Sequence, residues 1–287
     1  MNFIKLQGAG NDFVLVETSD VKRDWSQVAV VMCNRHFGIG ADGLLLLLPS
    51  DVADFQMRIF NPDGSEAEAC GNGLRCLVKY AINRGLLANI EAQEVVIETT
   101  AGIRKARINK AADKAVQIQV SLGVPKLAAK DIPVKIAGGD RGLVDIKSLL
   151  SYTVTVDDWG LLLNFVSMGN PHAVYFYQQP VSDFPLARLG PKVEQHRIFP
   201  QRVNFEVARL IGRQQIEARV WERGVGETLA CGTGAGAVAV AAQLLGFVDD
   251  KVDIKLLGGI LSVEWDGVGE VFLGGPAEIV FTGEYPD

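Results

Sequence analysis

Short stretches of alternating apolar and polar residues recur along the chain, and two longer stretches have helical character. Runs rich in Val, Ile and Phe predict strands at "FVLVE", "FQMRIF", "VVIETT" and "VQIQV", and later at "HAVYFY", "RVNFEVARL", "IEARVW" and "GEVFLGG". One helix is predicted in each half, over residues 72–83 and 234–245, with Gly85 and Gly246 as stop signals. Strands grouped around one helix favour the α+β class.

The order of these elements repeats. "GNDFV" matches "GNPHAV", "MRIFNPDGSEAEACGNG" matches "ARVWERGVGETLACGTG", and "VVIETTAGIRKARI" matches "VDIKLLGGILSVEW", in the same order and at a nearly constant offset. Such self-similarity indicates an internal duplication. We therefore predict two pseudosymmetric domains, each a curved antiparallel sheet around a central helix.

The stretch "SLGVPKL", with Gly123 and Pro125, marks the boundary between the halves. The first domain is predicted over 1–121 and the second over 122–275. The tail "PAEIVFTGEYPD" reads as one more strand that could close either sheet. We assign this strand, residues 276–287, to the first domain.

Length and charge restrict the function classes. A chain of 287 residues suits two domains of ordinary size. Its net charge of −6 disfavours nucleic acid and anionic membrane surfaces as partners, because both would repel it. The apolar runs are too short to span a bilayer, and the glycine-rich start is unlike a signal peptide. We expect a cytoplasmic protein that binds a small molecule; its oligomeric state stays open, with a homodimer as one option.

The four cysteines, Cys33, Cys70, Cys76 and Cys231, form no C-x-x-C pair, and only three histidines accompany them. This spacing disfavours a metal site, and the expected reducing compartment disfavours a disulfide framework. Cys33 and Cys76 lack a distinctive setting and are predicted to be core residues.

Cys70 and Cys231 each lie in the pattern E-x-x-A-C-G-x-G, at the start of a predicted helix. Free N–H groups and the helix dipole stabilise an anion there, which predicts a lowered thiol pKa and a reactive thiolate. The adjacent glycines let a carboxylate approach the backbone. The alternative is that both cysteines are small buried hydrophobic residues, but matched positions in a duplicated fold favour chemistry.

Duplicated domains tend to face each other across a pseudo-twofold axis, so matched residues are expected to converge on one cleft. One thiolate could then remove a proton from a stereogenic carbon while the opposite thiol delivers a proton to the other face. Backbone N–H groups of both turns would stabilise charge on the adjacent carboxylate. The pattern therefore predicts inversion of configuration by two general bases.

At these motifs the sequence resembles the diaminopimelate epimerases, a family of cofactor-independent amino-acid racemases and epimerases. The resemblance covers essentially the whole chain and rests on "GAGNDFV", "GIGADG", "NPDGSEAEACGNGLRC", "VSMGNPHAV", "RVNFE" and "WERGVGETLACGTGAGA". It implies a two-domain pseudosymmetric fold, no pyridoxal phosphate and no metal. The implied reaction interconverts LL- and meso-diaminopimelate in lysine and peptidoglycan precursor biosynthesis.

The resemblance also implies roles for individual residues. Cys70 and Cys231 match the acid–base pair. His172 and Glu222 match positions that adjust the protonation of the cysteines. The implied substrate-binding residues are Asn11, Asn61, Gly71, Asn72, Asn170, Asn204, Glu222, Arg223, Gly232 and Thr233.

Side-chain chemistry supports two of these roles independently. Arg223 can clamp a carboxylate with two hydrogen bonds, and Glu222 can accept from an ammonium group. One position departs from part of the family, because some members carry glutamine where this chain has Gly43.

Other readings remain at this stage. A related two-cysteine racemase could act on another amino acid, such as proline or histidine. A thiol hydrolase or transferase would use one cysteine and leaves the second motif unexplained. A redox protein cycling a Cys70–Cys231 disulfide would explain both thiols, but not the Glu222–Arg223 pair or the matched asparagines. A non-catalytic binding module would not need the cysteines. Activity on LL-diaminopimelate, compared with single-ended amino acids, separates these readings.

Overall fold

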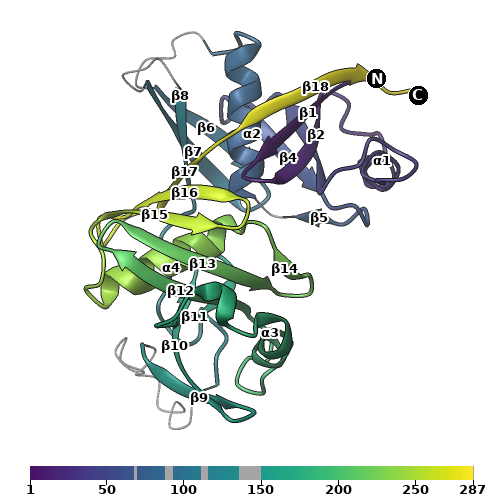
Figure 1. The fold of residues 1–287 in the computed structure, drawn as a ribbon. Coiled ribbons are helices and arrows are strands. Elements are labelled where there is room, and N and C mark those ends of the chain that lie inside the picture. Colours follow the sequence, from purple (N-terminus) through teal and green to yellow (C-terminus); the bar gives the residue numbers. More distant parts are fainter. Residues whose placement is uncertain (68–69, 88–92, 111–115, 136–149, 287) are drawn as a thin grey trace. The chain divides into compact units, whose positions relative to one another are not determined.

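A computed structural model describes residues 1–67, 70–87, 93–110, 116–135 and 150–286 (Figure 1). The chain divides into two compact units. The first unit comprises Met1–Ser121 together with Gly274–Asp287, and the second comprises Leu122–Leu273. Within the described ranges, no helix has the length and apolar character needed to cross a membrane.

The first unit contains most of its elements in one continuous run, with a last strand from the end of the chain. Its elements are β1 (Asn2–Gly8), β2 (Asn11–Glu17), α1 (Trp25–Met32), β3 (Gly43–Leu48), β4 (Phe55–Phe60), β5 (Glu66–Ala67), α2 (Gly71–Asn83), β6 (Gln93–Thr99), β7 (Gly102–Lys110), β8 (Val116–Ser121) and β18 (Glu278–Glu284). The last strand, β18, pairs antiparallel with β1.

The second unit repeats this order. Its elements are β9 (Tyr152–Val156), β10 (Trp159–Ser167), β11 (Pro171–Phe176), a short 3-10 helix (Val181–Asp183), α3 (Leu186–Glu194), β12 (Asn204–Gly212), β13 (Gln215–Glu222), β14 (Gly226–Thr228), α4 (Gly232–Leu244), β15 (Lys251–Leu256) and β16 (Gly259–Glu264). The following strand, β17 (Phe272–Gly275), crosses the division between the units.

Strand pairing confirms the predicted duplication. The antiparallel pairs β1–β2, β3–β4 and β6–β7 correspond to β10–β11, β12–β13 and β15–β16. The parallel pairs β2–β3 and β4–β6 correspond to β11–β12 and β13–β15. On its free side, the first strand of each repeat pairs with an added strand, β18 in one unit and β9 in the other.

The α+β class is confirmed, but each sheet is mixed rather than antiparallel throughout. Parallel neighbours require a crossover connection, usually a helix, because a tight turn cannot reverse the chain twice. Here α1 lies between β2 and β3 in the chain, and α2 lies between β4 and β6. In the second unit α3 and α4 occupy the corresponding connections.

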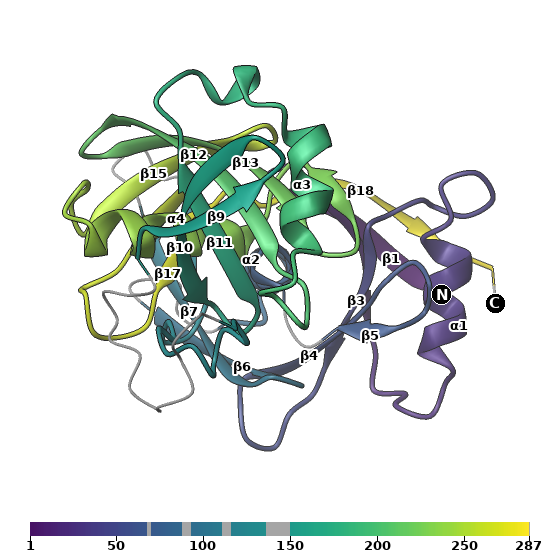
Figure 2. The ribbon, with the colours of Figure 1, turned by 90° about the horizontal axis from the view of Figure 1, so that it is seen from below.

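The two predicted helices are α2 and α4, each beginning one or two residues earlier than expected. Each packs across the strands of its own unit: α2 on β1 to β4 and β7 to β8, and α4 on β10 to β12 and β15 to β16 (Figure 2). Gly85 and Gly246 follow the helices with φ angles of 68° and 73°, a conformation that favours glycine. The shorter helices α1 and α3 were not predicted; α3 contains Pro191, which reads as a breaker.

Gly190 on α3 lies directly against the ring of Trp221. A Cβ at position 190 would be 2.6 Å from Cδ2 and 2.7 Å from Cγ of the indole. We expect Gly190→Ala to lower the free energy of unfolding by about 1–3 kcal/mol, because the added methyl forces the ring to move. Gly160→Ala is the matched control, since a Cβ there meets no described atom within 4 Å. Urea denaturation measures both; equal stabilities would contradict the packing argument.

Candidate active site

The two cysteines occupy the same position in the two repeats. Cys70 is the N-cap of α2, with φ −142° and ψ 119°, and Cys231 is the N-cap of α4, with φ −125° and ψ 115°. In each case the helix begins at the following glycine. This placement agrees with the sequence-based expectation, although Ala69 of the first motif lies outside the described residues.

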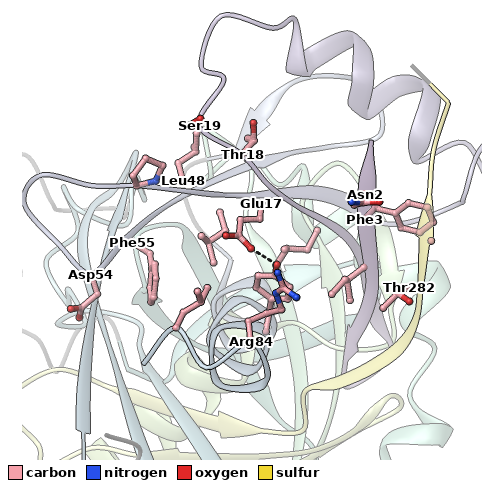
Figure 3. A pocket seen from close by; sticks show the side chains of 17 residues that line it. Asn2, Phe3, Glu17, Thr18, Ser19, Leu48, Asp54, Phe55, Arg84 and Thr282 are labelled. Carbon is pink, nitrogen blue, oxygen red and sulfur yellow. Dashed lines mark hydrogen bonds between the residues drawn. The ribbon is translucent and has the colours of Figure 1, made fainter. Parts of the chain in front are cut away.

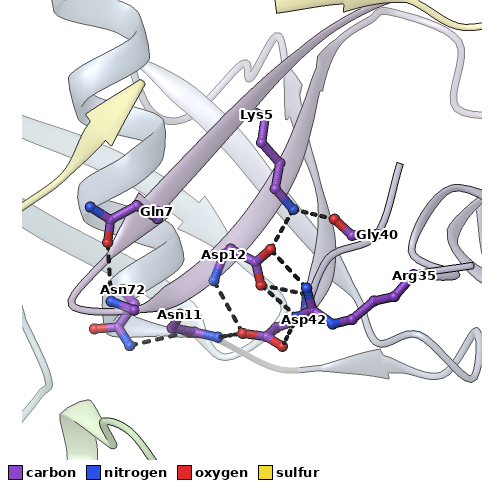
Figure 4. A network of polar contacts seen from close by, with 9 residues as sticks. Lys5, Gln7, Asn11, Asp12, Arg35, Gly40, Asp42 and Asn72 are labelled. Atoms are coloured by element: carbon purple, nitrogen blue, oxygen red, sulfur yellow. Dashed lines mark hydrogen bonds and ion pairs between the residues drawn. The ribbon is translucent and has the colours of Figure 1, made fainter. Parts of the chain in front are cut away.

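In the first unit, Asn11 contacts both Cys70 and Asn72 at the start of α2. Figure 4 shows Asn11 between Asn72 and Asp42. Asn11 Oδ1 accepts a hydrogen bond from Asn72 Nδ2 at 3.1 Å, and the Cys70 sulfur lies 3.8 Å from the same oxygen. Asn11 Nδ2 donates to Asp42 Oδ2 at 2.8 Å. Both ends of this amide are therefore held, and its oxygen faces the thiol.

An ion-pair network holds Asp42 in turn. Arg35 contacts Asp12 at 2.7 Å and Asp42 at 2.6 Å, and Lys5 contacts Asp12 at 2.5 Å. Burial alone would raise the pKa of Asp12, but hydrogen bonds from Arg35 and Lys5 lower it well below its usual range. Asp12 is thus charged at neutral pH, and its ion pair with Arg35 helps to hold Asp42, which binds Asn11.

A buried arginine, Arg75 on α2, fixes the second asparagine. Its side chain is fully buried, and NH2 donates to Asn72 Oδ1 at 2.7 Å. Its Nε and NH1 make no hydrogen bond within the described part of the chain. Burial lowers the pKa of Arg75, while negative charge at Cys76 or Cys70 would raise it. Arg75 lies in the motif "NPDGSEAEACGNGLRC", but no role was predicted for it, since an arginine in a helix usually reads as a surface residue.

Asn61 and Gly43 lie at strand ends of the same unit. Asn61 forms a turn with Ser65, donating from Nδ2 to the Ser65 hydroxyl at 2.9 Å and from its backbone N–H to the Ser65 carbonyl at 2.8 Å. A Cβ at Gly43 would lie 3.1 Å from the Phe60 carbonyl oxygen, so a longer side chain there would require a shift of β4.

In the second unit, a series of contacts between polar side chains ends at Cys231. Its members are Glu206, His172, Asn170 and Thr233. Asn170 Nδ2 donates to Thr233 Oγ1 at 3.3 Å, and Thr233 Oγ1 lies 3.5 Å from the Cys231 sulfur. Asn170 Oδ1 lies 2.9 Å from Nε2 of His172. The sulfur also accepts a hydrogen bond from the Gly234 N–H at 3.4 Å.

The chain continues to Glu206, a residue that sequence reasoning missed. Nδ1 of His172 lies 2.7 Å from Glu206 Oε1, and both side chains are buried. Asn204 and Glu206 share one face of β12, because side chains alternate along a strand. A polar residue on the buried face of "RVNFEVARL" was the signal that could have identified it.

The turn between β13 and β14 carries Glu222 and Arg223. Asn204 Oδ1 accepts from the Arg223 backbone N–H at 2.9 Å, and Asn204 Nδ2 donates to the Pro171 carbonyl at 3.0 Å. Thr228 donates to Glu222 Oε1 at 2.5 Å. Asn204 therefore links this turn to the start of β11 through the two ends of its amide.

The predicted lowering of the thiol pKa is wrong for Cys231. Burial raises its pKa well above the usual value, and the charge of Glu222 raises it further. Hydrogen bonds from Thr233 and Gly234 act in the opposite direction without compensating. Burial also raises the pKa of Cys33 to about 11 and that of Cys76 to about 12, in keeping with their predicted place in the core.

A separate hollow of about 1000 Å³ lies at the other end of α2 (Figure 3). Glu17, Tyr80 and Arg84 line it, and the Tyr80 hydroxyl donates to Glu17. Burial and this hydrogen bond raise the pKa of Tyr80 to about 12. Cys70 caps the opposite end of the helix, so this hollow is distinct from the polar cluster around the thiol.

Comparison with known proteins is consistent along the whole chain. A family model described as "Diaminopimelate epimerase" matches residues 3–128 and 164–280. The chain is 43% identical to a diaminopimelate epimerase of Methanococcus maripaludis over 99% of each chain. It is 44% identical to one of Moorella thermoacetica, over 100% of this chain and 99% of the relative.

Solved structures show the same fold at low identity. A PhzF-family phenazine biosynthesis protein of Bacillus anthracis has a TM-score of 0.70 and 17% identity, covering 100% of this chain and 99% of its own. A hydroxyproline epimerase of Agrobacterium vitis has a TM-score of 0.71 and 15% identity, covering 99% of this chain and 91% of its own.

Proposed function

Because the chain belongs to the diaminopimelate epimerase family, we propose that Cys70 and Cys231 are the acid–base pair of its epimerisation reaction. The enzyme is an isomerase of lysine biosynthesis. Its substrate has two amino-acid ends, and the reaction inverts one α-carbon.

One observation carries the assignment of the cysteines. Each cysteine is the N-cap residue of the central helix of its own repeat, and in each case the helix begins at the following glycine. Two symmetric acid–base groups are what inversion of an α-carbon requires, since a proton must leave one face and arrive on the other.

The chemistry balances without an external reagent. One thiolate accepts the α-proton, so that a C–H bond breaks and an S–H bond forms. The electron pair delocalises into the α-carboxylate. The other thiol gives its proton to the opposite face and becomes the new thiolate. We expect the backbone N–H groups of Gly71 with Asn72, and of Gly232 with Thr233, to stabilise the charge on the carboxylate.

The two thiols differ in their surroundings, which supports different starting states. Burial and the charge of Glu222 favour the thiol form at Cys231. Arg75, buried on α2, interacts electrostatically with Cys76 and, less strongly, with Cys70, so its positive charge favours negative charge at the Cys70 thiol. We propose that Cys70 starts as the base and Cys231 as the acid in the free enzyme.

The non-reacting end of the substrate is assigned to the other polar residues of the family motifs. Arg223 offers a guanidinium for the distal carboxylate, and Glu222 an acceptor for the distal ammonium. Asn204 holds the turn that carries both residues. Two protein thiols supply and remove the proton, so the proposed reaction needs no cofactor. Both thiols must stay reduced, which supports a cytoplasmic location.

Proton labelling tests this scheme directly. Unlabelled LL-diaminopimelate is incubated with the enzyme in D₂O, and the mixture is analysed by mass spectrometry at low conversion. We expect the meso product to carry one deuterium, because the acid thiol has exchanged with solvent. The remaining LL substrate should stay unlabelled, because the base returns the proton it has just removed. Product that retains the substrate's own hydrogen would contradict two bases.

A further inference from the structure

The position beneath the first turn of the central helix holds different residues in the two repeats. A Cβ at Gly73 would lie 3.1 Å from Leu45 Cδ2, whereas a Cβ at Gly234 would lie 2.9 Å from Glu206 Oε1. The register of β3 on β2, and of β12 on β11, gives the same correspondence. The second unit therefore has a carboxyl group where the first has an aliphatic side chain.

The adjacent strand changes in the same way. Phe13 pairs with Gly43 in the first unit, and His172 pairs with Asn204 at the corresponding place in the second. A buried Phe–Leu pair is thus replaced by a buried His–Glu pair below Cys231. Burying a polar pair costs free energy that apolar residues would not. Because the same fold accepts apolar residues at these places, the polar pair calls for a role other than packing.

The hydrogen bonds around His172 have a defined direction. The oxygen of Asn170 can only accept, so Nε2 of His172 carries the hydrogen of their 2.9 Å contact. The amide nitrogen of Asn170 donates to the Thr233 hydroxyl at 3.3 Å. The hydroxyl hydrogen of Thr233 is then free to point at the Cys231 sulfur, 3.5 Å away. In this series of hydrogen bonds, each group therefore donates to the next one toward the Cys231 sulfur.

This direction leaves two arrangements for the 2.7 Å contact between Nδ1 of His172 and Glu206 Oε1. A doubly protonated ring would donate from Nδ1 to an ionised carboxylate, whereas a ring with hydrogen on Nε2 alone accepts at Nδ1 from a protonated carboxyl. Oε2 makes no hydrogen bond within the described residues, and an ionised oxygen left bare in the interior would be costly. Burial raises the pKa of Glu206; His172 and a backbone hydrogen bond lower it, the charge of Glu222 raises it further, and the net direction is upward.

We propose that Glu206 is a positioning residue: its protonated carboxyl donates to Nδ1 of His172, fixes the Nε2–H tautomer, and thereby orients Asn170 and Thr233 toward the Cys231 sulfur. This inference rests on the proposed role of Cys231. The inference concerns the second unit alone. It gives a reason why this unit has Glu206 at the place where the first unit has Leu45.

Two substitutions at one position test the proposal. Glu206→Gln keeps a donor for Nδ1, whereas Glu206→Leu introduces the residue of the first unit. We expect Glu206→Gln to keep kcat within about threefold of the wild type. Glu206→Leu should lower kcat about 10- to 100-fold and leave KM nearly unchanged, because it disturbs the surroundings of the Cys231 thiol and not the binding of the substrate. The ¹⁵N signals of His172 should show hydrogen on Nε2 in the wild type and Glu206→Gln, and a mixture of tautomers in Glu206→Leu.

Asn164→Leu is the control for loss of a buried polar residue. Asn164 accepts from the Ser151 N–H at 2.9 Å and donates to the Val174 carbonyl at 3.0 Å in the same unit. The Asn164→Leu substitution should lower the melting temperature without changing the ¹⁵N signals of His172. A normal kcat and unchanged signals in Glu206→Leu would overturn the proposal, as would a Gln variant as impaired as Leu. An active Cys231→Ala variant would instead refute the proposed function itself.

Discussion

Replacing either Cys70 or Cys231 with alanine reduces epimerisation of LL-diaminopimelate by about 10²–10⁴-fold, because each variant lacks one of two required acid–base groups. Turnover is measured in both directions by chiral chromatography. The two variants should be impaired alike, since neither direction can be completed by one thiol.

Cys76→Ala is the matched control for this pair. Cys76 lies on α2, which Cys70 precedes, and is fully buried; its sulfur is no partner in the hydrogen bonds that the described structure shows around Asn11. This variant should keep its turnover even if it unfolds at a lower temperature. A Cys70 or Cys231 variant that retained more than about a tenth of wild-type turnover would exclude the two-base scheme.

Arg223→Lys lowers kcat/KM for diaminopimelate by about 10- to 100-fold, because losing a charge-assisted hydrogen bond costs about 1.5–3 kcal/mol. A guanidinium binds a carboxylate with two parallel hydrogen bonds, and an ammonium cannot reproduce both. Fixing the distal end also keeps the α-carbon in register with the thiols, so kcat should fall together with affinity.

Arg223→Lys alters one hydrogen bond within the protein, from NH1 of Arg223 to the Gln201 carbonyl at 3.0 Å, but not the backbone contact of the turn. The backbone N–H of residue 223, which donates to Asn204, is unchanged by it, so the turn should keep its conformation. Arg213→Lys serves as the control, since Arg213 is 64% exposed and pairs with Asp249 on the surface. If Arg223→Lys matched this control in steady-state kinetics, another residue would have to bind the distal carboxylate.

Much of the fold was predictable because the internal duplication makes the same order of helices and strands occur twice along the sequence. The helices with strong sequence signals, α2 and α4, begin at the Cys-Gly motifs and end at glycines with positive φ. What the pattern could not give was the parallel pairing of β2 with β3 and of β4 with β6. Alternation of apolar residues sets the face of a strand, and the direction of its neighbour depends on the crossover helices.

The site was predictable where chemistry lies in a motif, and not where it depends on burial. The motifs placed both thiols at helix starts, yet the helix dipole argument gave the wrong direction for the pKa of Cys231, because burial outweighs it. Arg75 and Glu206 escaped notice for a related reason. Each is an ionisable residue inside the protein, and a single sequence does not state which polar residues the fold will bury.

The strand β18 has a consequence for the order in which this protein can fold during synthesis. It completes the first sheet by pairing with β1, and the Met1 ammonium contacts the Tyr285 carbonyl at 2.7 Å. The second unit, a continuous segment, leaves the ribosome before β18 does. The unit made first is therefore finished last, and until then β1 exposes an unpaired edge. A chain truncated before residue 274 would contain the whole second unit but would lack the last strand of the first.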